Sequence, residues 1–197
     1  MAKITVQNLA RNIVNAIQTE VEKIPGFDNG AIRLLFVPKC PEAVEYLCGF
    51  GKDCELDLVF PAKKGGKHVR PAGFRGSNEP ECDCYGDTAT KVGGCAYARK
   101  KGYGRYSSDM PEKAITHGRT NDKGCIVFDI YITDKTETKV SPLPIDYFRL
   151  YVAVSGAMGD EDEQCALAAC DVLQQWVDIK NDGFGHYEKY LELDGPK

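Results

Sequence analysis

The segment His117-Gly118-Arg119 carries the residue types best suited to holding a small anionic ligand or an iron centre. An imidazole nitrogen can ligate a transition metal or transfer a proton near neutral pH. A guanidinium two residues away offers a rigid fork of donors that matches a carboxylate or a phosphate. The competing interpretation is a solvated loop histidine without a ligand. We therefore take His117 and Arg119 as candidate ligand contacts.

Cysteine is unusually frequent, with nine residues in a chain of 197. Cys82-Asp83-Cys84 places two thiols two residues apart, where they can share one metal ion or form a strained disulfide. A structural zinc site normally needs four ligands. The other ligand types nearby stand at no recognised zinc spacing: Cys40, Cys48, Cys54 and His68. Zinc at Cys82 and Cys84 is thus the weaker cofactor expectation, against free thiols on an exposed loop.

The remaining cysteines fit buried, reduced thiols better than disulfides. The number of cysteines is odd, and residues 1–11 lack the basic and apolar plan of an export signal, so the expected compartment is the cytoplasm. Cys125 falls in a strand pattern, whereas Cys165 and Cys170 fall in a helix pattern. Cysteine is among the most frequently buried residue types, so we expect all three to be apolar fillers of the core.

Composition and charge argue against several classes of function. Apolar residues make up 43% of the chain and charged residues 27%, which is typical of a folded globular protein. The net charge of −4 disfavours nucleic acids and anionic membranes as partners. No apolar run approaches the roughly 20 residues that cross a bilayer. The chain contains no GxGxxG, Walker, HExxH, GxSxG or CxxC motif.

Hydrophobic periodicity predicts the elements that must position these residues. Helices are expected over 5–24, 41–48, 87–101 and 160–179, and strands over 31–37, 54–60, 124–133 and 147–155. The last two strands follow one another like a hairpin, which favours an antiparallel sheet with helices packed on it. The sequence therefore predicts an α+β fold in a single domain spanning residues 1–197.

Residues 61–86 interrupt the pattern and read as a loop insertion. Six Gly or Pro residues precede Pro80, and Lys63, Lys64, Lys67, Arg70 and Arg75 form a basic run. A segment of this length without periodicity is typical of a functional loop or a mobile insertion.

The pair Gly93-Gly94 lies inside the helix predicted over 87–101. Each glycine costs about 1 kcal/mol relative to alanine at such a position. Close packing against another backbone would compensate for this cost, and close approach of a ligand is the alternative. We expect Ala89, Val92, Ala96 and the pair Gly93-Gly94 to lie on or near the inner side of this helix.

The acidic run Asp160-Glu161-Asp162-Glu163 opens the last predicted helix. Negative charge is favourable in the first turn of a helix because of the helix dipole. We therefore interpret the run as a solvated helix start in preference to a metal site.

The stretch Val152-Ala153-Val154-Ser155-Gly156-Ala157, with the acidic run and the alanine-rich continuation to Ala169, resembles the GlcG/HbpS-like family of heme-degrading or heme-binding domain proteins. In that family a last strand ends in a V-S-G turn and leads into a helix with paired acids followed by small residues. The helix over 87–101 and the leading amphipathic helix resemble the family more loosely.

The resemblance implies a profilin-like, three-layer α/β sandwich that forms homo-oligomers. It also implies a small-molecule ligand, since some family members bind heme or related cofactors. Gly93, Gly94 and Ala96 would then serve close helix packing, including packing between subunits.

Together these features predict a cytoplasmic, homo-oligomeric small-ligand-binding protein, with heme or another tetrapyrrole as the leading ligand. The expected contacts are His117 toward the metal, and Arg119, Lys91, Arg99 and Ser155 toward carboxylate or phosphate groups. Two alternatives stay open. An enzyme acting on a small anionic metabolite would use His117 or a low-pKa cysteine, and a scaffold would bind its partner through the 61–86 loop.

Overall fold

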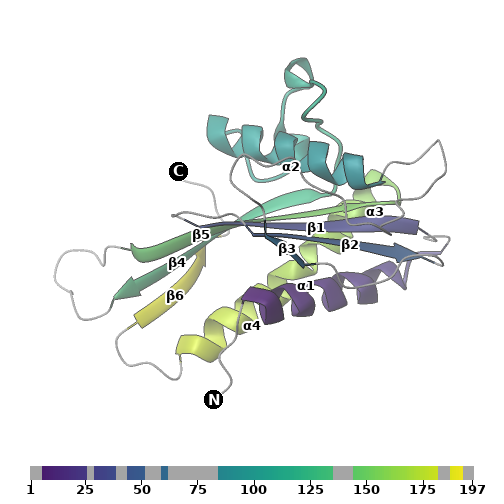
Figure 1. The fold of residues 1–197 in the computed structure, drawn as a ribbon. Coiled ribbons are helices and arrows are strands. Elements are labelled where there is room, and N and C mark those ends of the chain that lie inside the picture. Colours follow the sequence, from purple (N-terminus) through teal and green to yellow (C-terminus); the bar gives the residue numbers. More distant parts are fainter. Residues whose placement is uncertain are drawn as a thin grey trace.

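A six-stranded antiparallel sheet forms the centre of the protein, with helices on both faces (Figure 1). The computed structural model describes residues 6–25, 29–38, 44–51, 59–61, 84–134, 144–181 and 187–192. The strands lie in the order β3-β2-β1-β5-β4-β6. Their bounds are β1 Asn29–Pro38, β2 Val44–Gly51, β3 Val59–Pro61, β4 Cys125–Asp134, β5 Pro144–Ser155 and β6 Tyr187–Glu192. The predicted α+β architecture is confirmed.

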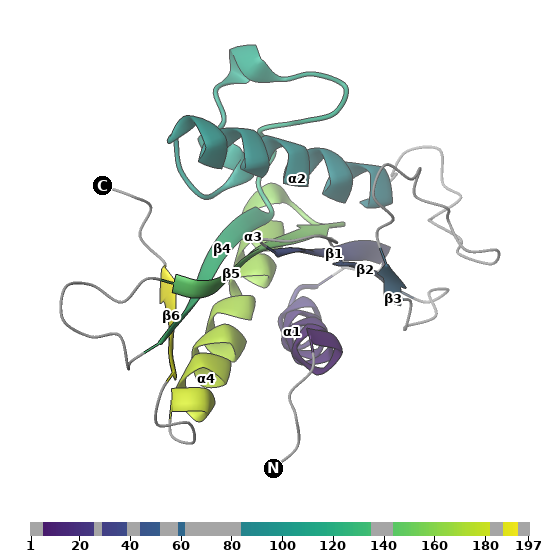
Figure 2. The same cartoon turned by 60° about the vertical axis from the view of Figure 1, so that its left-hand side comes forward.

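The helices give the molecule three layers. Figure 2 shows helix α2 (Cys84–Lys101) on one face of the sheet, and α1 (Val6–Val21) and α4 (Ala169–Asn181) on the other. The short helix α3 (Gly159–Leu167) joins β5 to α4 and packs against α1. Two short 3₁₀ helices, Ser107–Asp109 and Glu112–Ala114, lie between α2 and β4. In the described part of the chain, no helix has both the length and the apolar composition to cross a membrane.

The main hydrophobic core lies between the sheet and the layer formed by α1, α3 and α4. Alternate residues of β1, β4 and β5 fill it from the sheet, because successive side chains of a strand point to opposite faces. Its fully buried members include Ile32, Leu34, Ile126, Phe128, Leu150 and Val152. Burying each such side chain contributes about 1.5–3 kcal/mol.

The cysteines predicted as fillers lie in the hydrophobic interior, Cys165 and Cys170 in or against the main core and Cys125 in a second core between the sheet and α2. Cys125 and Cys165 are fully buried, and Cys170 is half-buried and packs against the main core. Five cysteines are free thiols in the structure: Cys84, Cys95, Cys125, Cys165 and Cys170.

The predicted helix over 41–48 is wrong where the structure describes it, because residues 44–51 form strand β2. This strand pairs with β1 from Asn29↔Gly51 to Phe36↔Val44. Its sequence, VEYLCGFG, also alternates with a period of two. The pairing with the neighbouring strand overrides the weak local helix preference.

Two other boundaries differ from expectation. The helix predicted over 160–179 is divided at Ala168 into α3 and α4, and strand β6 was not predicted. Of the strand predicted over 54–60, the structure describes only the last residues, which belong to β3. Residues 62–83 of the expected insertion lie outside the described residues. The hairpin of β4 and β5 is confirmed, with Phe128 opposite Leu150 and Ile126 opposite Val152.

Candidate functional site

Helix α2 presents a polar inner face to the sheet. Thr88, Lys91, Cys95 and Arg99 are buried or half-buried and recur at steps of three and four residues, as one face of a helix requires. Val92 and Ala96 also pack there, as predicted, but Ala89 is exposed. The expected inner position was therefore wrong for Ala89, and the pair Gly93-Gly94 faces the segment 118–120 instead of the sheet. Charged side chains of the strands also lie in the space between α2 and the sheet.

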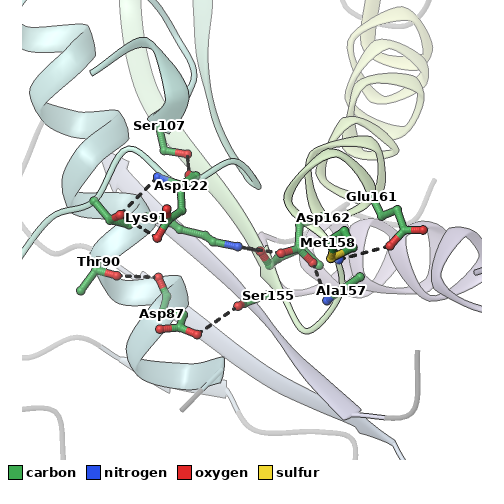
Figure 3. Close-up of polar contacts among 12 residues, drawn as sticks. Asp87, Thr90, Lys91, Ser107, Asp122, Ser155, Ala157, Met158, Glu161 and Asp162 are labelled. Atoms are coloured by element: carbon green, nitrogen blue, oxygen red, sulfur yellow. Dashed lines mark hydrogen bonds and ion pairs between the residues drawn. The ribbon is translucent and has the colours of Figure 1, made fainter. Parts of the chain in front are cut away.

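Lys91 and Asp162 form a buried ion pair beside the C-terminal end of strand β5 (Figure 3). Lys91 Nζ lies 2.7 Å from Asp162 Oδ2 and donates a second hydrogen bond, 3.0 Å long, to the carbonyl oxygen of Val154. The two side chains are only 5% and 3% exposed. Asp162 Oδ1 also accepts a 3.0 Å hydrogen bond from the amide of Ala157. The pair therefore ties α2, β5 and α3 together.

Burial raises the pKa of the Asp162 carboxyl above its ordinary value, against the opposing effect of the Lys91 ammonium. The expectation of a fully solvated acidic run was wrong for this residue, although Asp160 is exposed.

Gly124 provides the space in which the Lys91–Asp162 pair lies. Its φ of +112° is rarely adopted by residues with a side chain. A Cβ at this position would lie 2.6 Å from the Val154 carbonyl oxygen, 2.7 Å from Asp162 Cβ and 2.9 Å from Lys91 Nζ. Only glycine therefore allows both the turn into β4 and the ion pair beside it.

Ser155 and Asp87 lie beside this ion pair, at the start of α2. Ser155 Oγ is 3.5 Å from Asp87 Oδ2, and Figure 3 shows the two side chains directed toward each other. Ser155 is 5% exposed, whereas Asp87 is exposed to solvent. Lys91 lies one turn after Asp87 and binds the carbonyl of the residue before Ser155. The structure thus brings the predicted contacts Lys91 and Ser155 to the same end of α2.

Arg99 belongs to a second ionic cluster, at the other end of α2. Its Nε and Nη2 lie 2.8 and 2.5 Å from Asp129 Oδ2. Arg149 Nε donates to Asp129 Oδ1 at 2.7 Å, from the position directly opposite on β5. Asp129 is fully buried. A carboxylate with two guanidiniums makes strong charge-assisted hydrogen bonds, so this cluster fixes the C-terminal half of α2 to the sheet.

His117 lies at the tip of an exposed turn on the outer side of α2. Thr116 and Arg119 close the turn through two backbone hydrogen bonds of 3.1 and 3.2 Å. The Arg119 guanidinium stacks over the Tyr97 ring at 4.3 Å, and its Nε donates to the Ala114 carbonyl at 2.6 Å. These contacts hold the turn while the side chain of His117 stays exposed.

The glycine pair of α2 allows this turn to pack directly on the helix. A Cβ on Gly93 would lie 2.1 Å from the carbonyl oxygen of Gly118, and one on Gly94 would lie 1.8 Å from that of Thr120. The Thr120 amide also donates a 3.1 Å hydrogen bond to the Thr90 carbonyl. The interpretation of Gly93-Gly94 as a tight backbone packing site is confirmed within the chain.

The described thiols have the environment of buried core groups. Burial raises the pKa of Cys95, Cys165 and Cys170, for Cys165 to about 11. A nucleophilic cysteine needs the opposite shift. Cys84 is buried at the start of α2, whereas Cys82 lies outside the described residues. Within the ranges that the structure describes, no three His, Cys, Asp or Glu side chains group as metal ligands.

The predicted residues thus fall in three places: Lys91 lies near Ser155, His117 lies in the same turn as Arg119, and Arg99 lies apart from both groups. Sequence reasoning missed the buried carboxylates Asp129 and Asp162. The signal for Asp129 was an acid on a strand whose hairpin partner carries Arg149 at the opposing position. No comparable signal marked Asp162 within its acidic run.

A scan against protein-family models and searches of curated proteins and of solved structures each find no match to this chain.

Proposed function

We propose that this chain is a small-ligand-binding protein of the GlcG/HbpS-like type, with heme or another tetrapyrrole as the leading candidate ligand. The observation that supports the proposal is the exposed imidazole of His117 on a turn that the rest of the structure holds in place. A solvent-facing imidazole on a fixed turn can ligate a ferric iron without prior rearrangement of the backbone.

The surroundings of His117 suit an amphipathic, anionic ligand. Ile115, two residues before it, is 45% exposed and offers an apolar contact for a macrocycle. Arg119 has its Nε on the Ala114 carbonyl and its face on Tyr97. In our proposal its terminal nitrogens donate to a carboxylate of the ligand, as arginine does in bidentate recognition.

Lys91 and Arg99 have a positioning role in this proposal. Both bind buried carboxylates and hold α2, which carries the packing surface for the His117 turn. Direct contact of Lys91, Arg99 or Ser155 with a ligand stays a prediction. A cytoplasmic location is part of the same proposal, and the free thiols of Cys84, Cys95, Cys125, Cys165 and Cys170 support it.

A hemin titration followed in the Soret region tests the proposal, with Thr116→Ala as the control for His117→Ala. We expect a saturable spectral change for the wild type and for Thr116→Ala, and at least about tenfold weaker binding for His117→Ala, because an axial ligand is lost. A linear, non-saturating response of the wild type would remove heme as the ligand. Equal binding by the two variants would remove His117 from the site.

A further inference from the structure

Arg119 is a half-buried cation that has no carboxylate partner in the described part of the chain. In this it differs from Lys91, Arg99 and Arg149, each of which has an aspartate oxygen within 2.7 Å. Arg119 instead donates its Nε to the carbonyl oxygen of Ala114 at 2.6 Å. A guanidinium carries further N–H donors on its terminal nitrogens. Among the described residues nothing accepts a hydrogen bond from these nitrogens, so the donors are open to an acceptor from outside the chain.

The side chain of Arg119 is nevertheless fixed in position. Its Cζ lies over the Tyr97 ring, 4.3 Å from the centre of the ring. A Cβ on Gly93 would lie 3.2 Å from the Arg119 Cβ, so the base of the side chain packs closely on α2. The backbone of Arg119 closes the turn through its hydrogen bonds with Thr116. A donor held in this way loses little freedom when a ligand binds, and such preorganisation raises affinity.

Tyr97 fixes the guanidinium because the ring itself has a fixed place. It packs against a cluster formed by the buried side chains of Ala98, Met110 and Ala114. The carbonyl oxygen that accepts from Arg119 Nε belongs to Ala114, a member of the same cluster. The ring therefore holds one face of the guanidinium while this carbonyl holds its Nε edge. The edge formed by the terminal nitrogens is the one that remains for a ligand.

We propose that Tyr97 determines ligand specificity: by holding Arg119 it makes the site select a ligand with a free carboxylate over the matching ester or amide. The inference rests on the proposed function and deepens it, since it states what the ligand must carry besides any group that contacts His117. A carboxylate accepts two parallel N–H···O bonds from the edge of a guanidinium. An ester or amide lacks the negative charge and the second equivalent oxygen, so it gains much less from a fixed arginine.

Benzoate and benzamide test this site without iron and without a macrocycle, because they differ in charge but little in shape. The NMR signal of the Arg119 Nε–H group reports binding, and Arg119→Gln identifies the signal. Tyr97→Leu removes the ring, whereas Tyr97→Phe keeps it. Tyr103→Leu is the matched control, because the Tyr103 ring is 51% exposed and lies 6.3 Å from the Tyr97 ring.

We expect a saturable shift of the Arg119 signal with benzoate, and none with benzamide, in the wild type, Tyr97→Phe and Tyr103→Leu. Tyr97→Leu should bind benzoate at least about tenfold more weakly, because the guanidinium loses the ring that holds it. Arg119→Lys should show a loss of the same size in the shifts of neighbouring backbone amides, since an ammonium keeps the charge but not the planar fork. This second variant leaves the Tyr97 packing intact, so it tests the site even if Tyr97→Leu melts early.

A wild type whose Arg119 signal does not respond to benzoate would overturn the proposal. So would equal shifts with benzoate and benzamide, or equal benzoate binding by Tyr97→Leu and Tyr97→Phe.

Hemin and its dimethyl ester separate this inference from the proposed function. We expect the ester to bind the wild type at least about tenfold more weakly than hemin does, and Tyr97→Leu to lose most of this difference. A wild type that binds hemin and the ester equally would reject the carboxylate selection while heme stays the ligand. A wild type that binds benzoate as expected but does not bind hemin would reject heme and uphold the carboxylate site.

Discussion

Lys91 Nζ and Asp162 Oδ2 lie 2.7 Å apart although 71 residues separate them in the sequence. The pair connects the helix on one face of the sheet with the helix that leads into the layer on the other face. Both side chains are almost fully buried, so neither charge has water as an alternative partner.

Removal of the Lys91 charge should destabilise the protein strongly. Lys91→Met leaves the Asp162 carboxylate buried without its cation, and we expect a loss of about 3–5 kcal/mol in the free energy of unfolding. Lys91→Met with Asp162→Asn should recover most of this loss, because the amide keeps an acceptor for Ala157 without a charge. Urea unfolding measures both values.

The control for this prediction is Lys23→Met, since Lys23 is 62% exposed and pairs with Glu20 on the surface. The free energy of unfolding of Lys23→Met should fall by no more than about 1 kcal/mol. If Lys91→Met cost no more than Lys23→Met, the buried pair would have no special role in stability.

Substitution of Gly124 by alanine should destabilise the protein much more than the same substitution of Gly102. Both have positive φ, but a Cβ on Gly124 meets three atoms within 3 Å, whereas a Cβ on Gly102 meets nothing within 4 Å. We expect about 1 kcal/mol of destabilisation for Gly102→Ala and clearly more for Gly124→Ala. Thermal melting compares the two, and similar melting temperatures would contradict the close packing at Gly124.

Alanine at Gly94 should detach the His117 turn from α2. The added methyl group would overlap the Thr120 carbonyl, and overpacking of this kind typically costs about 1–3 kcal/mol. Hydrogen exchange should then accelerate at the Thr120 amide, which donates to the Thr90 carbonyl. Gly118→Ala is the control, because open space surrounds its Cβ position. Unchanged protection of Thr120 in Gly94→Ala would disprove this packing.

We expect the free energy of unfolding to fall at alkaline pH because of the raised pKa of the Cys165 thiol. Its pKa is raised from 9.0 to about 11 in the folded state by burial and by the neighbouring carboxylate Asp162. Above pH 9 the unfolded chain loses the thiol proton while the folded chain keeps it, so the unfolded state is favoured as the pH rises.

The stability contribution of the Cys165 thiol is complete below pH 9 and is lost through pH 11, and it amounts to about 2–3 kcal/mol. Urea unfolding across this range should therefore give a steeper decline for the wild type than for Cys165→Ala. Parallel pH profiles of the two proteins would rule out this effect.

The sequence by itself determined the layered α+β architecture. Ile126, Phe128 and Ile130 alternate on one strand, and Leu150, Val152 and Val154 alternate on the next, which is enough to predict a hairpin with one face in a core. The glycine pair of α2 likewise predicted a close backbone contact. These features depend on local periodicity and on the conformational cost of glycine, both of which are properties of short segments.

Only the tertiary structure decided which charges are buried and with which partners. Asp129 alternates like a residue of a solvated strand face, but α2 covers that face and places Arg99 on its carboxylate. Asp162 sits in a run that the helix dipole explains, yet the turn at Gly124 and the rotation of α2 bring Lys91 to it. Such pairs join segments that are distant in the chain, so their formation depends on strand register and helix rotation, which local sequence patterns do not specify.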